Sequence, residues 1–328
     1  MDRFNRAYVD VLGSGRITVG LMTPAARPAG AMADLDAERQ VAQRADALGF
    51  AALWARDVPL MVPQGSDGEA SALDDPFVWL ATLAAATHRI ALGTAAAVLP
   101  LRNPLHLAKT ALSLDRLSGG RFILGLGSGD RPEEFAAFGE DRALRAEKFR
   151  AQWSMLRSAL GRRTSEREEL LEATGGFELM RAHSTRVPMV VVGSARQSLQ
   201  WIAANAEAWA TYYRDEARQE GRIGLWRSAL RERAGGEIKP FVQSVHLDLL
   251  ACPDAPATPI ELGLRTGRHQ LVAYLARMQQ AGVGHVMLHL APGPRTALDI
   301  VDEIGRHVLP ALAQTGVAAL SNQQKEVA

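Results

Sequence analysis

The chain has 328 residues, 47% of them hydrophobic and 22% charged, and its formal net charge is +1 at pH 7. This composition predicts a globular protein with a large core. The balanced charge gives no reason to expect a nucleic acid or an anionic membrane as a partner. Because the sequence has neither an apolar secretory segment nor the ~20 apolar residues of a membrane span, we expect a cytoplasmic protein.

The first part of the chain alternates between strand-like and helix-like segments, the pattern of repeated βα units. Residues 90–99 form a near-continuous apolar run, which is typical of a strand buried on both faces. The helix that follows starts near Pro104 and ends at Ser118-Gly119-Gly120. The predicted segments are strand 17–22, helix 35–48, strand 51–55, helix 77–86, strand 90–99, helix 105–117 and strand 121–126.

Residues 130–187 interrupt the alternation with a charged, mostly helical stretch, which we interpret as the fourth helix plus an insertion. The alternation then resumes with strand 188–193, helix 195–204, strand 206–212, helix 216–233, strand 241–250, helix 268–281, strand 285–290 and helix 297–313. Eight strands and eight helices predict an α/β fold, a single closed (β/α)8 TIM barrel with an insertion after the fourth strand. A doubly wound open sheet is the alternative, but it would seldom need eight units in one domain. We predict one barrel domain over 1–314 and a polar C-terminal tail over 315–328.

Ligands of such barrels bind at the carboxyl ends of the strands, so the site residues are expected there. In VVVGSARQS the apolar strand ends at Gly193 and a helix is expected to begin near Ala195, which places Ser194 at its N-cap. A helix N-terminus with a hydroxyl group and the nearby Arg196 is suited to bind phosphate, and Gln197 could add a polar contact. An ordinary serine N-cap is the structural alternative.

The glycines of GLGSGDRP, Gly125, Gly127 and Gly129, allow a ligand to approach the backbone closely. Their G-x-G-x-G spacing differs from G-x-G-x-x-G, and no strand ending in an acidic residue follows, so a nicotinamide dinucleotide site is not predicted. A turn that simply needs glycines is the alternative reading of this segment.

Charged and nucleophilic residues give weaker signals. Arg56-Asp57 ends the second strand with two charges, which either close the barrel end as an ion pair or line a substrate pocket. The eight histidines show no metal-binding spacing, and only His289 is expected at the barrel mouth. The lone Cys252 excludes an internal disulfide, and without a G-x-S-x-G motif nucleophilic hydrolysis is not supported.

Several ordered segments resemble the luciferase-like flavin monooxygenases: GTAAAVLPLRNP (93–104), DRLSGGRFILGLGSG (115–129), FAALWARDVPL (50–60) and PMVVVGSARQSLQWIAANAEAWATYY (188–213). The first segment, NRAYVDVLGSGRITVGLMTP, and the last ones, KPFVQSVHLDLL, LGLRTGRHQL and HVMLHL, resemble one bacterial subfamily of luciferase-type oxidoreductases. The resemblance covers nearly the whole chain and implies a TIM barrel that binds reduced FMN. It also implies that the cofactor-binding residues are Thr94, Ala95, Ser128, Asp130, Gly193, Ser194, Arg196, Gln197 and Tyr212. In that family a non-prolyl cis peptide often lies under the flavin ring, at the position of Thr94-Ala95.

The function implied by the resemblance is that of a two-component monooxygenase, which uses reduced FMN and oxygen on a small organic substrate. A separate flavin reductase and a homodimer are implied as partners. Arg56, Asp57 and Arg131 are the catalytic candidates, and for Arg131 an ion pair on the adjacent helix is the alternative. Val58-Pro59 stands where luciferase has a proton-transferring histidine, so light emission is not expected. Hydride transfer with the deazaflavin F420 and flavin binding without turnover remain alternatives.

Overall fold

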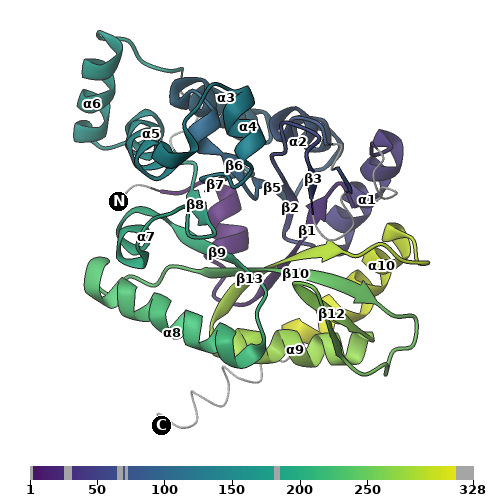
Figure 1. The fold of residues 1–328 in the computed structure, drawn as a ribbon. Coiled ribbons are helices and arrows are strands. Elements are labelled where there is room, and N and C mark those ends of the chain that lie inside the picture. The colour runs from purple at the N-terminus through teal and green to yellow at the C-terminus, as the bar shows by residue number, and fades with distance from the viewer. Residues whose placement is uncertain (1–2, 26–31, 65–68, 71–72, 181–184, 315–328) are drawn as a thin grey trace.

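The fold is a closed barrel of parallel strands surrounded by helices (Figure 1), seen in a computed structural model that describes residues 3–25, 32–64, 69–70, 73–180 and 185–314. Among these residues the barrel strands are, in pairing order, β1 (Thr18–Thr23), β2 (Ala52–Ala55), β5 (Ala91–Thr94), β7 (Phe122–Gly127), β8 (Met189–Val192), β9 (Ala208–Tyr212), β10 (Phe241–Leu249) and β13 (Val283–Leu290). β13 pairs in parallel with both β10 and β1, which closes the barrel. The predicted (β/α)8 fold is therefore confirmed, and the open sheet is excluded.

The helices that cover the barrel follow the strands in turn. They are α1 (Leu35–Leu48), α2 (Pro76–Ala86), α3 (Pro104–Leu117), α5 (Arg145–Leu160), α7 (Leu199–Asn205), α8 (Glu216–Arg233), α9 (Arg268–Ala281) and α10 (Ala297–Glu303). Between β7 and β8 the chain adds α4 (Pro132–Ala137) and α6 (Thr164–Thr174), the predicted insertion, and α6 projects from the body of the barrel (Figure 1). None of the described helices has both the length and the apolar character that crossing a bilayer requires.

Short elements complete the chain. The strand predicted over 90–99 is divided, because β5 ends at Thr94, a cis peptide joins Ala95 to Ala96, and β6 (Ala97–Val98) then pairs with β7. A hairpin of β11 (Thr258–Ile260) and β12 (Gly263–Thr266) extends β10. The remaining elements are β3 (Pro63–Gln64), β4 (Glu69–Ala70), the π-helical turns η1 (Tyr8–Leu12) and η4 (Ile304–Val308), and the 3-10 turns η2 (Leu99–Leu101) and η3 (Arg142–Leu144).

The helix predicted over 195–204 begins four residues later than expected. Ser198, not Ser194, is the N-cap of α7, and its hydroxyl accepts a hydrogen bond from the backbone N–H of Trp201 at 3.2 Å. Ala195 and Arg196 have φ angles of 45° and 59°, which a right-handed helix does not contain. The prediction of Ser194 as an N-cap is therefore wrong, and this residue lies in a turn between β8 and α7.

The barrel interior is filled from its amino end by a separate apolar cluster. Trp54 and Met287 belong to it, and Leu12 of η1 packs against the same cluster, so the N-terminal segment closes this end of the barrel. The carboxyl ends of the strands, called the barrel mouth below, are left for a ligand. The predicted tail over 315–328 lies outside the described residues, so the division at 314 stays a prediction.

Candidate functional site

The barrel mouth brings together residues from strands that are far apart in the sequence. Side chains alternate along a strand, so Arg56 follows Trp54 and His289 follows Met287 on the inward face. By the same alternation Tyr212 follows the interior residue Ala210, and Ala95 itself packs against the interior cluster. Three of the predicted site residues, Arg56, Ala95 and Tyr212, therefore share the inward side of the mouth.

The turn between β8 and α7 has an unusual backbone conformation, and the side chain of Gln197 fixes it by hydrogen bonds. Gly193, Ala195 and Arg196 all have positive φ angles, and such conformations in non-glycine residues are found more often at ligand sites. The buried Gln197 donates from Nε2 to the carbonyl oxygen of Ala146 at 2.8 Å, and its Oε1 accepts from Arg150 at 2.9 Å. Gln197 thus connects the turn to the start of α5, and its contact with a cofactor stays a prediction.

Three arginines gather beside this turn, and we call Arg142, Arg145 and Arg196 the arginine cluster. Burial, and then the nearby charges of Arg196 and Arg142, lower the pKa of Arg145 below its ordinary value. The Nε atom of Arg145 is buried without a hydrogen-bond partner. Among the described residues no carboxylate forms an ion pair with any of the three. Like charges held together with a buried donor left over form a site suited to an anion.

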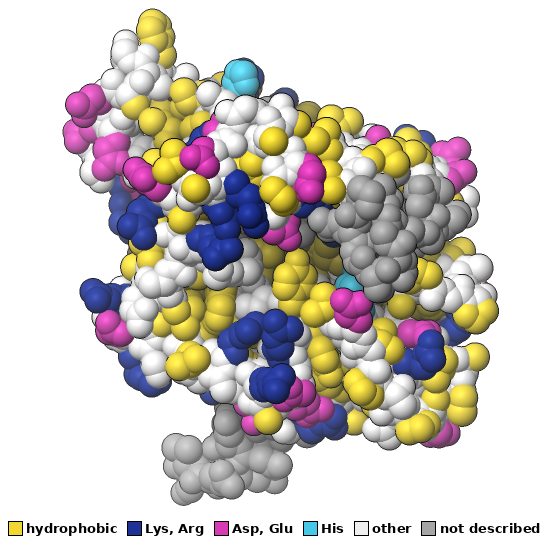
Figure 2. Space-filling model, in the orientation of Figure 1, with side chains coloured by type: hydrophobic (Ala, Val, Ile, Leu, Met, Phe, Trp, Pro, Cys, Tyr) yellow, Lys and Arg dark blue, Asp and Glu magenta, His cyan; other side chains and the backbone are white. Residues whose placement is uncertain are grey.

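The predicted strand-end residues Gly193, Ser194 and Arg196 belong to this turn, with Ser194 and Arg196 exposed, and their binding of a phosphate stays a prediction. Sequence reasoning missed Arg142 and Arg145, which come from η3 and the start of α5, about fifty positions earlier in the chain. Figure 2 shows Lys and Arg side chains in two groups near the centre of the face it presents, beside a hollow with hydrophobic side chains. An anionic ligand with an apolar body matches such a surface.

Asp57 is engaged in a buried ion pair. Its carboxylate accepts hydrogen bonds from Arg102 through both oxygens, at 2.8 Å each, and from the backbone N–H of Val98 at 2.9 Å. Arg102 also donates to Asp75 at 2.9 Å. Burial alone would lower the pKa of Arg102, but these two carboxylates raise it above its ordinary value. Asp57 thus closes the barrel end with Arg102, not with Arg56, and a catalytic role for it stays a prediction.

Arg131 pairs with the first turn of α4. Its guanidinium lies 3.4 Å from the carboxylate of Glu134, and the two side chains are 13% and 1% exposed. Burial raises the pKa of Glu134, and the charge of Arg131 opposes this shift. The structure therefore contains the helix ion pair that the sequence left as an alternative. Contact of Arg131 with a cofactor stays a prediction.

Thr94 links two strands where their backbone pairing is interrupted. Its fully buried hydroxyl donates to the carbonyl oxygen of Gly125 at 2.7 Å and accepts from the Gly125 N–H at 3.0 Å. A Cβ atom on Gly125 would lie 1.9 Å from the Thr94 carbonyl oxygen, so this glycine is required by strand packing. Ser128 is half-buried and Asp130 exposed in the loop after β7. Their proposed contacts with a cofactor stay predictions.

Two histidines meet at the mouth. His246 of β10 and His289 of β13 are paired residues on neighbouring strands, and their rings are perpendicular with centroids 4.6 Å apart. Nδ1 of His289 lies 3.1 Å from Nε2 of His246. Burial, and then the positive charge of Arg56, lower the pKa of His246. The sequence predicted His289 at the mouth but not its partner, although counting alternate residues back along β10 would have found it.

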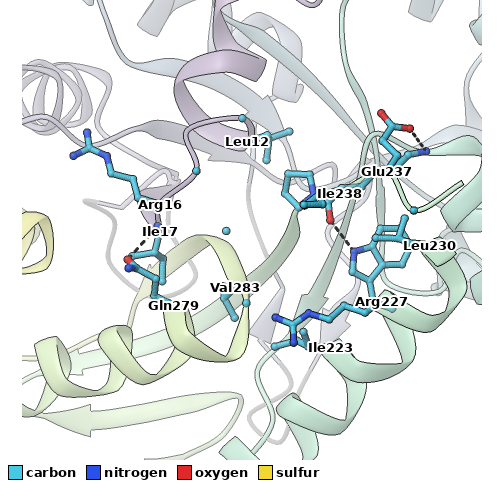
Figure 3. A pocket seen from close by; sticks show the side chains of 18 of the residues that line it. Leu12, Arg16, Ile17, Ile223, Arg227, Leu230, Glu237, Ile238, Gln279 and Val283 are labelled. Atoms are coloured by element: carbon cyan, nitrogen blue, oxygen red, sulfur yellow. Dashed lines mark hydrogen bonds and ion pairs between the residues drawn. The ribbon is translucent and has the colours of Figure 1, made fainter. Parts of the chain in front are cut away.

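A cavity of about 540 Å³ lies at the opposite, amino end of the strands, between α8 and α9 (Figure 3). Leu12, Ile223 and Val283 line it, and it is therefore separate from the mouth. Within the described ranges, no group of three His, Cys, Asp or Glu side chains could hold a metal ion.

A family model described as luciferase-like monooxygenase matches residues 15–247. A 4-hydroxyprotoasukamycin monooxygenase of Streptomyces nodosus subsp. asukaensis is 33% identical over 130 residues, which are 39% of this chain and only 33% of that relative. The EDTA monooxygenase of Chelativorans sp. BNC1 has a similar fold, with a TM-score of 0.69 and 14% identity over 92% of this chain and 95% of that one. An F420-dependent secondary alcohol dehydrogenase also has a similar fold, with a TM-score of 0.65 and 15% identity, over 90% of this chain and 99% of that one.

Proposed function

This chain belongs to the luciferase-like monooxygenase family of oxidoreductases, and we propose that it is a two-component monooxygenase that uses reduced FMN and molecular oxygen on a small organic substrate. The observation that carries the proposal is the arginine cluster beside the turn after β8. Its donors suit a phosphate group, and the buried Nε of Arg145 still needs an acceptor. Bound there, reduced FMN would supply the electrons for oxygen activation.

In this proposal the chain's own residues bind and orient the cofactor. Arg145 and Arg196 hold the phosphate, and the backbone of the turn from Gly193 to Arg196 lies against it. Ala95, on the inward side of the mouth, is small enough that a flat flavin ring could approach the strand there.

We expect Ala95→Leu to weaken FMN binding at least about tenfold, or about 1.4 kcal/mol, because the larger side chain would occupy the space of the ring. Fluorescence titration of the apoprotein measures the affinity, and circular dichroism checks that the barrel is intact. Ala137→Leu, on α4 and exposed to solvent, is the matched control. Normal FMN binding by the Ala95→Leu protein would remove this strand end from the ring site.

The cofactor is tested directly by titrating the apoprotein with FMN and, separately, with F420, and recording difference spectra. Both molecules combine a tricyclic ring with a phosphate, so the fold alone does not distinguish them. Oxygen uptake with reduced FMN and a panel of organic substrates then separates a monooxygenase from a protein that only binds flavin. Binding of F420 without binding of FMN would replace the proposed reaction with hydride transfer.

The proposed enzyme also needs partners. Reduced FMN would come from a separate flavin reductase, since the glycine-rich loop after β7 lacks the spacing of a nicotinamide site. A cytoplasmic location fits this supply. A homodimer is proposed through α2 and α3, where Val78 and Leu117 are 64% and 62% exposed.

If this dimer forms, light scattering at micromolar concentration should give twice the 35.4 kDa mass of the chain. Val78→Asp combined with Leu117→Asp should then return it to the monomer mass, because charges at the centre of an apolar interface are costly to bury. Val9→Asp, on an exposed apolar residue of η1, is the control. A monomer mass for the wild type ends this part of the proposal.

A further inference from the structure

We propose that the cavity between α8 and α9 binds a hydrophobic monocarboxylate, whose carboxylate lies between Arg227 and Arg231 and whose apolar body lies on the buried floor (Figure 3). The volume of about 540 Å³ is within the range of small-molecule sites. Because the cavity is at the amino end of the barrel strands, it is separate from the mouth, and the proposal does not rest on the proposed reaction.

The floor of the cavity is apolar and comes from three distant parts of the chain. Leu12 of η1, Trp226 and Leu230 of α8, and Val283 at the start of β13 line it, and each is at most 5% exposed. The indole N–H of Trp226 already donates to the carbonyl oxygen of Lys239 at 3.0 Å. This ring therefore offers a ligand hydrophobic contact rather than a hydrogen bond.

Ile238, on the rim of the cavity, is 91% exposed to solvent. Single exposed apolar side chains are common on protein surfaces, but this one stands beside a floor that is itself apolar. A ligand with an apolar body would bury both surfaces at once, and the burial of apolar surface is a main source of affinity in such sites. The floor and Ile238 therefore favour an apolar body rather than a small inorganic anion.

Two arginines give one side of the cavity a positive charge. Arg227 and Arg231 are about one turn apart on α8, so their side chains lie on the same face of the helix, and both line the cavity. Within the described part of the chain neither forms an ion pair with a carboxylate. Arg227 donates to the carbonyl oxygen of Ala281 at 2.8 Å, and Arg231 donates to the Ser228 hydroxyl at 2.9 Å. Like charges at this spacing repel each other, and a carboxylate bound between them removes the repulsion.

The end of α9 fixes the position of Arg227. A Cβ atom at Gly282 would collide with Nη2 of Arg227, so a glycine there lets the guanidinium reach the carbonyl oxygen of Ala281. Figure 3 shows the Arg227 side chain crossing from α8 toward Val283. Since a guanidinium has five N–H donors and Ala281 takes one of them, the others serve a carboxylate in the cavity.

The other charges at the rim favour a single negative charge on the ligand. Glu237 supplies the carboxylate among the described lining residues, and it lies 3.8 Å from Nζ of Lys239. Figure 3 shows Glu237 above the cavity and Arg227 below it in the view. A ligand with two anionic ends would bring its second charge toward Glu237, whereas a monocarboxylate places only its apolar body there. Arg16 also lines the cavity, but its side chain points away from it (Figure 3).

Isothermal titration calorimetry of the protein with 2-naphthoate tests the site, and 2-naphthamide, which has the same ring system and no charge, is the matched control ligand. We expect saturable binding of 2-naphthoate that is at least about tenfold tighter than binding of 2-naphthamide. Bound 2-naphthoate should also raise the melting temperature, because the cavity exists only in the folded chain. Absence of saturable binding at millimolar concentration, or equal affinities for the two ligands, would overturn the proposal.

Arg227→Met and Arg231→Met should each weaken binding of 2-naphthoate roughly tenfold, because hydrogen bonds that involve a charged group are the stronger ones. The affinity for 2-naphthamide should not change, since the neutral ligand forms no ion pair. Arg231→Met is the decisive variant, because Arg231 bonds only the exposed Ser228 hydroxyl, whereas Arg227 also serves the end of α9. Arg116→Met, at an exposed position on α3, is the control. Unchanged affinity of Arg231→Met for 2-naphthoate would contradict the proposed position of the carboxylate.

The place of binding is tested by variants of the rim and of the mouth. Because Ile238 is exposed, Ile238→Ser should leave the melting temperature of the free protein unchanged and weaken binding of both ligands severalfold. Leu225→Ser, at an exposed position of α8 outside the cavity lining, is its control. The protein with Arg145→Met and Arg196→Met should bind 2-naphthoate as the wild type does. Loss of binding in that protein, but not in Arg231→Met, would place the ligand at the mouth and overturn the proposal.

Discussion

Replacement of both Arg145 and Arg196 by methionine is expected to weaken FMN binding by about 4 kcal/mol, or roughly 1000-fold, since each charged hydrogen bond contributes about 2 kcal/mol. Methionine preserves much of the side-chain length and removes the charge. Both residues belong to the arginine cluster, where their mutual proximity lowers the pKa of Arg145 in addition to the effect of its burial. Because neither arginine forms an ion pair with a described carboxylate, the double substitution breaks no ion pair. We therefore expect the melting temperature to be unchanged.

The measurement is fluorescence titration of FMN at two ionic strengths, because binding that depends on charge weakens as salt screens it. Arg116→Met with Arg231→Met is the matched control, since it also removes two positive charges, from exposed positions on α3 and α8. Arg196→Lys alone keeps both positive charges but loses the planar guanidinium donors of one residue, and it should give an intermediate affinity. Equal affinities of the double variant and the wild type would show that the phosphate lies elsewhere, and the proposed cofactor orientation would then be wrong.

Local sequence signals predicted the helices best where both ends carry a capping residue. The predicted bounds of α1 agree with the structure, because Asp34 accepts the hydrogen bond of Ala37 N–H at its start and Gly49, with φ 88°, ends it. The start of α7 was misplaced because two serines four residues apart, Ser194 and Ser198, carry the same capping signal. Only the backbone angles at Ala195 and Arg196 decide between them.

The candidate site was predictable only in part, because much of it depends on contacts between distant segments. The end of a strand marks Gly193 and Arg196 in the sequence, but no local signal predicts that Arg142 of η3 and Arg145 of α5 lie near the same turn. His246 meets His289 because the barrel closes β10 against β13, a pairing over 43 positions of sequence separation. The ion pair of Asp57 with Arg102 was likewise not predicted, because the two residues are 45 positions apart in the sequence.

His285 is expected to make the free energy of unfolding strongly dependent on pH, because it is a fully buried neutral histidine. Its Nε2 accepts a hydrogen bond from the indole N–H of Trp54 at 2.9 Å, so its proton is on Nδ1, which faces the Thr18 hydroxyl at 2.7 Å. The Thr18 hydroxyl in turn donates a hydrogen bond to the carbonyl oxygen of Val11 at 2.8 Å. Every donor in this chain has an acceptor only while the ring is neutral, and burial lowers the pKa of His285 to about 3.

The pH dependence of stability follows from this shift. The unfolded chain binds a proton at His285 near pH 6.5, and the folded protein does not do so until about pH 3. Above pH 6.5 both states are neutral and the contribution to the free energy of unfolding is complete. As the pH falls below 6.5, stability is lost by about 1.4 kcal/mol per unit, which amounts to roughly 4–5 kcal/mol at pH 3.

Substitution His285→Gln should remove this dependence. The glutamine oxygen can still accept from Trp54, but the side chain does not titrate, so we expect the variant to be about 2 kcal/mol less stable than the wild type at pH 7.5. Because only the wild type loses this contribution on acidification, the two stabilities should become equal near pH ~5 and then reverse in order. Urea unfolding followed by tryptophan fluorescence across this range measures both curves, with His307→Gln at an exposed position as control. Parallel curves for the wild type and His285→Gln would mean that His285 has the same pKa in the folded protein as in the unfolded chain, and ¹⁵N resonances of its ring would show this directly.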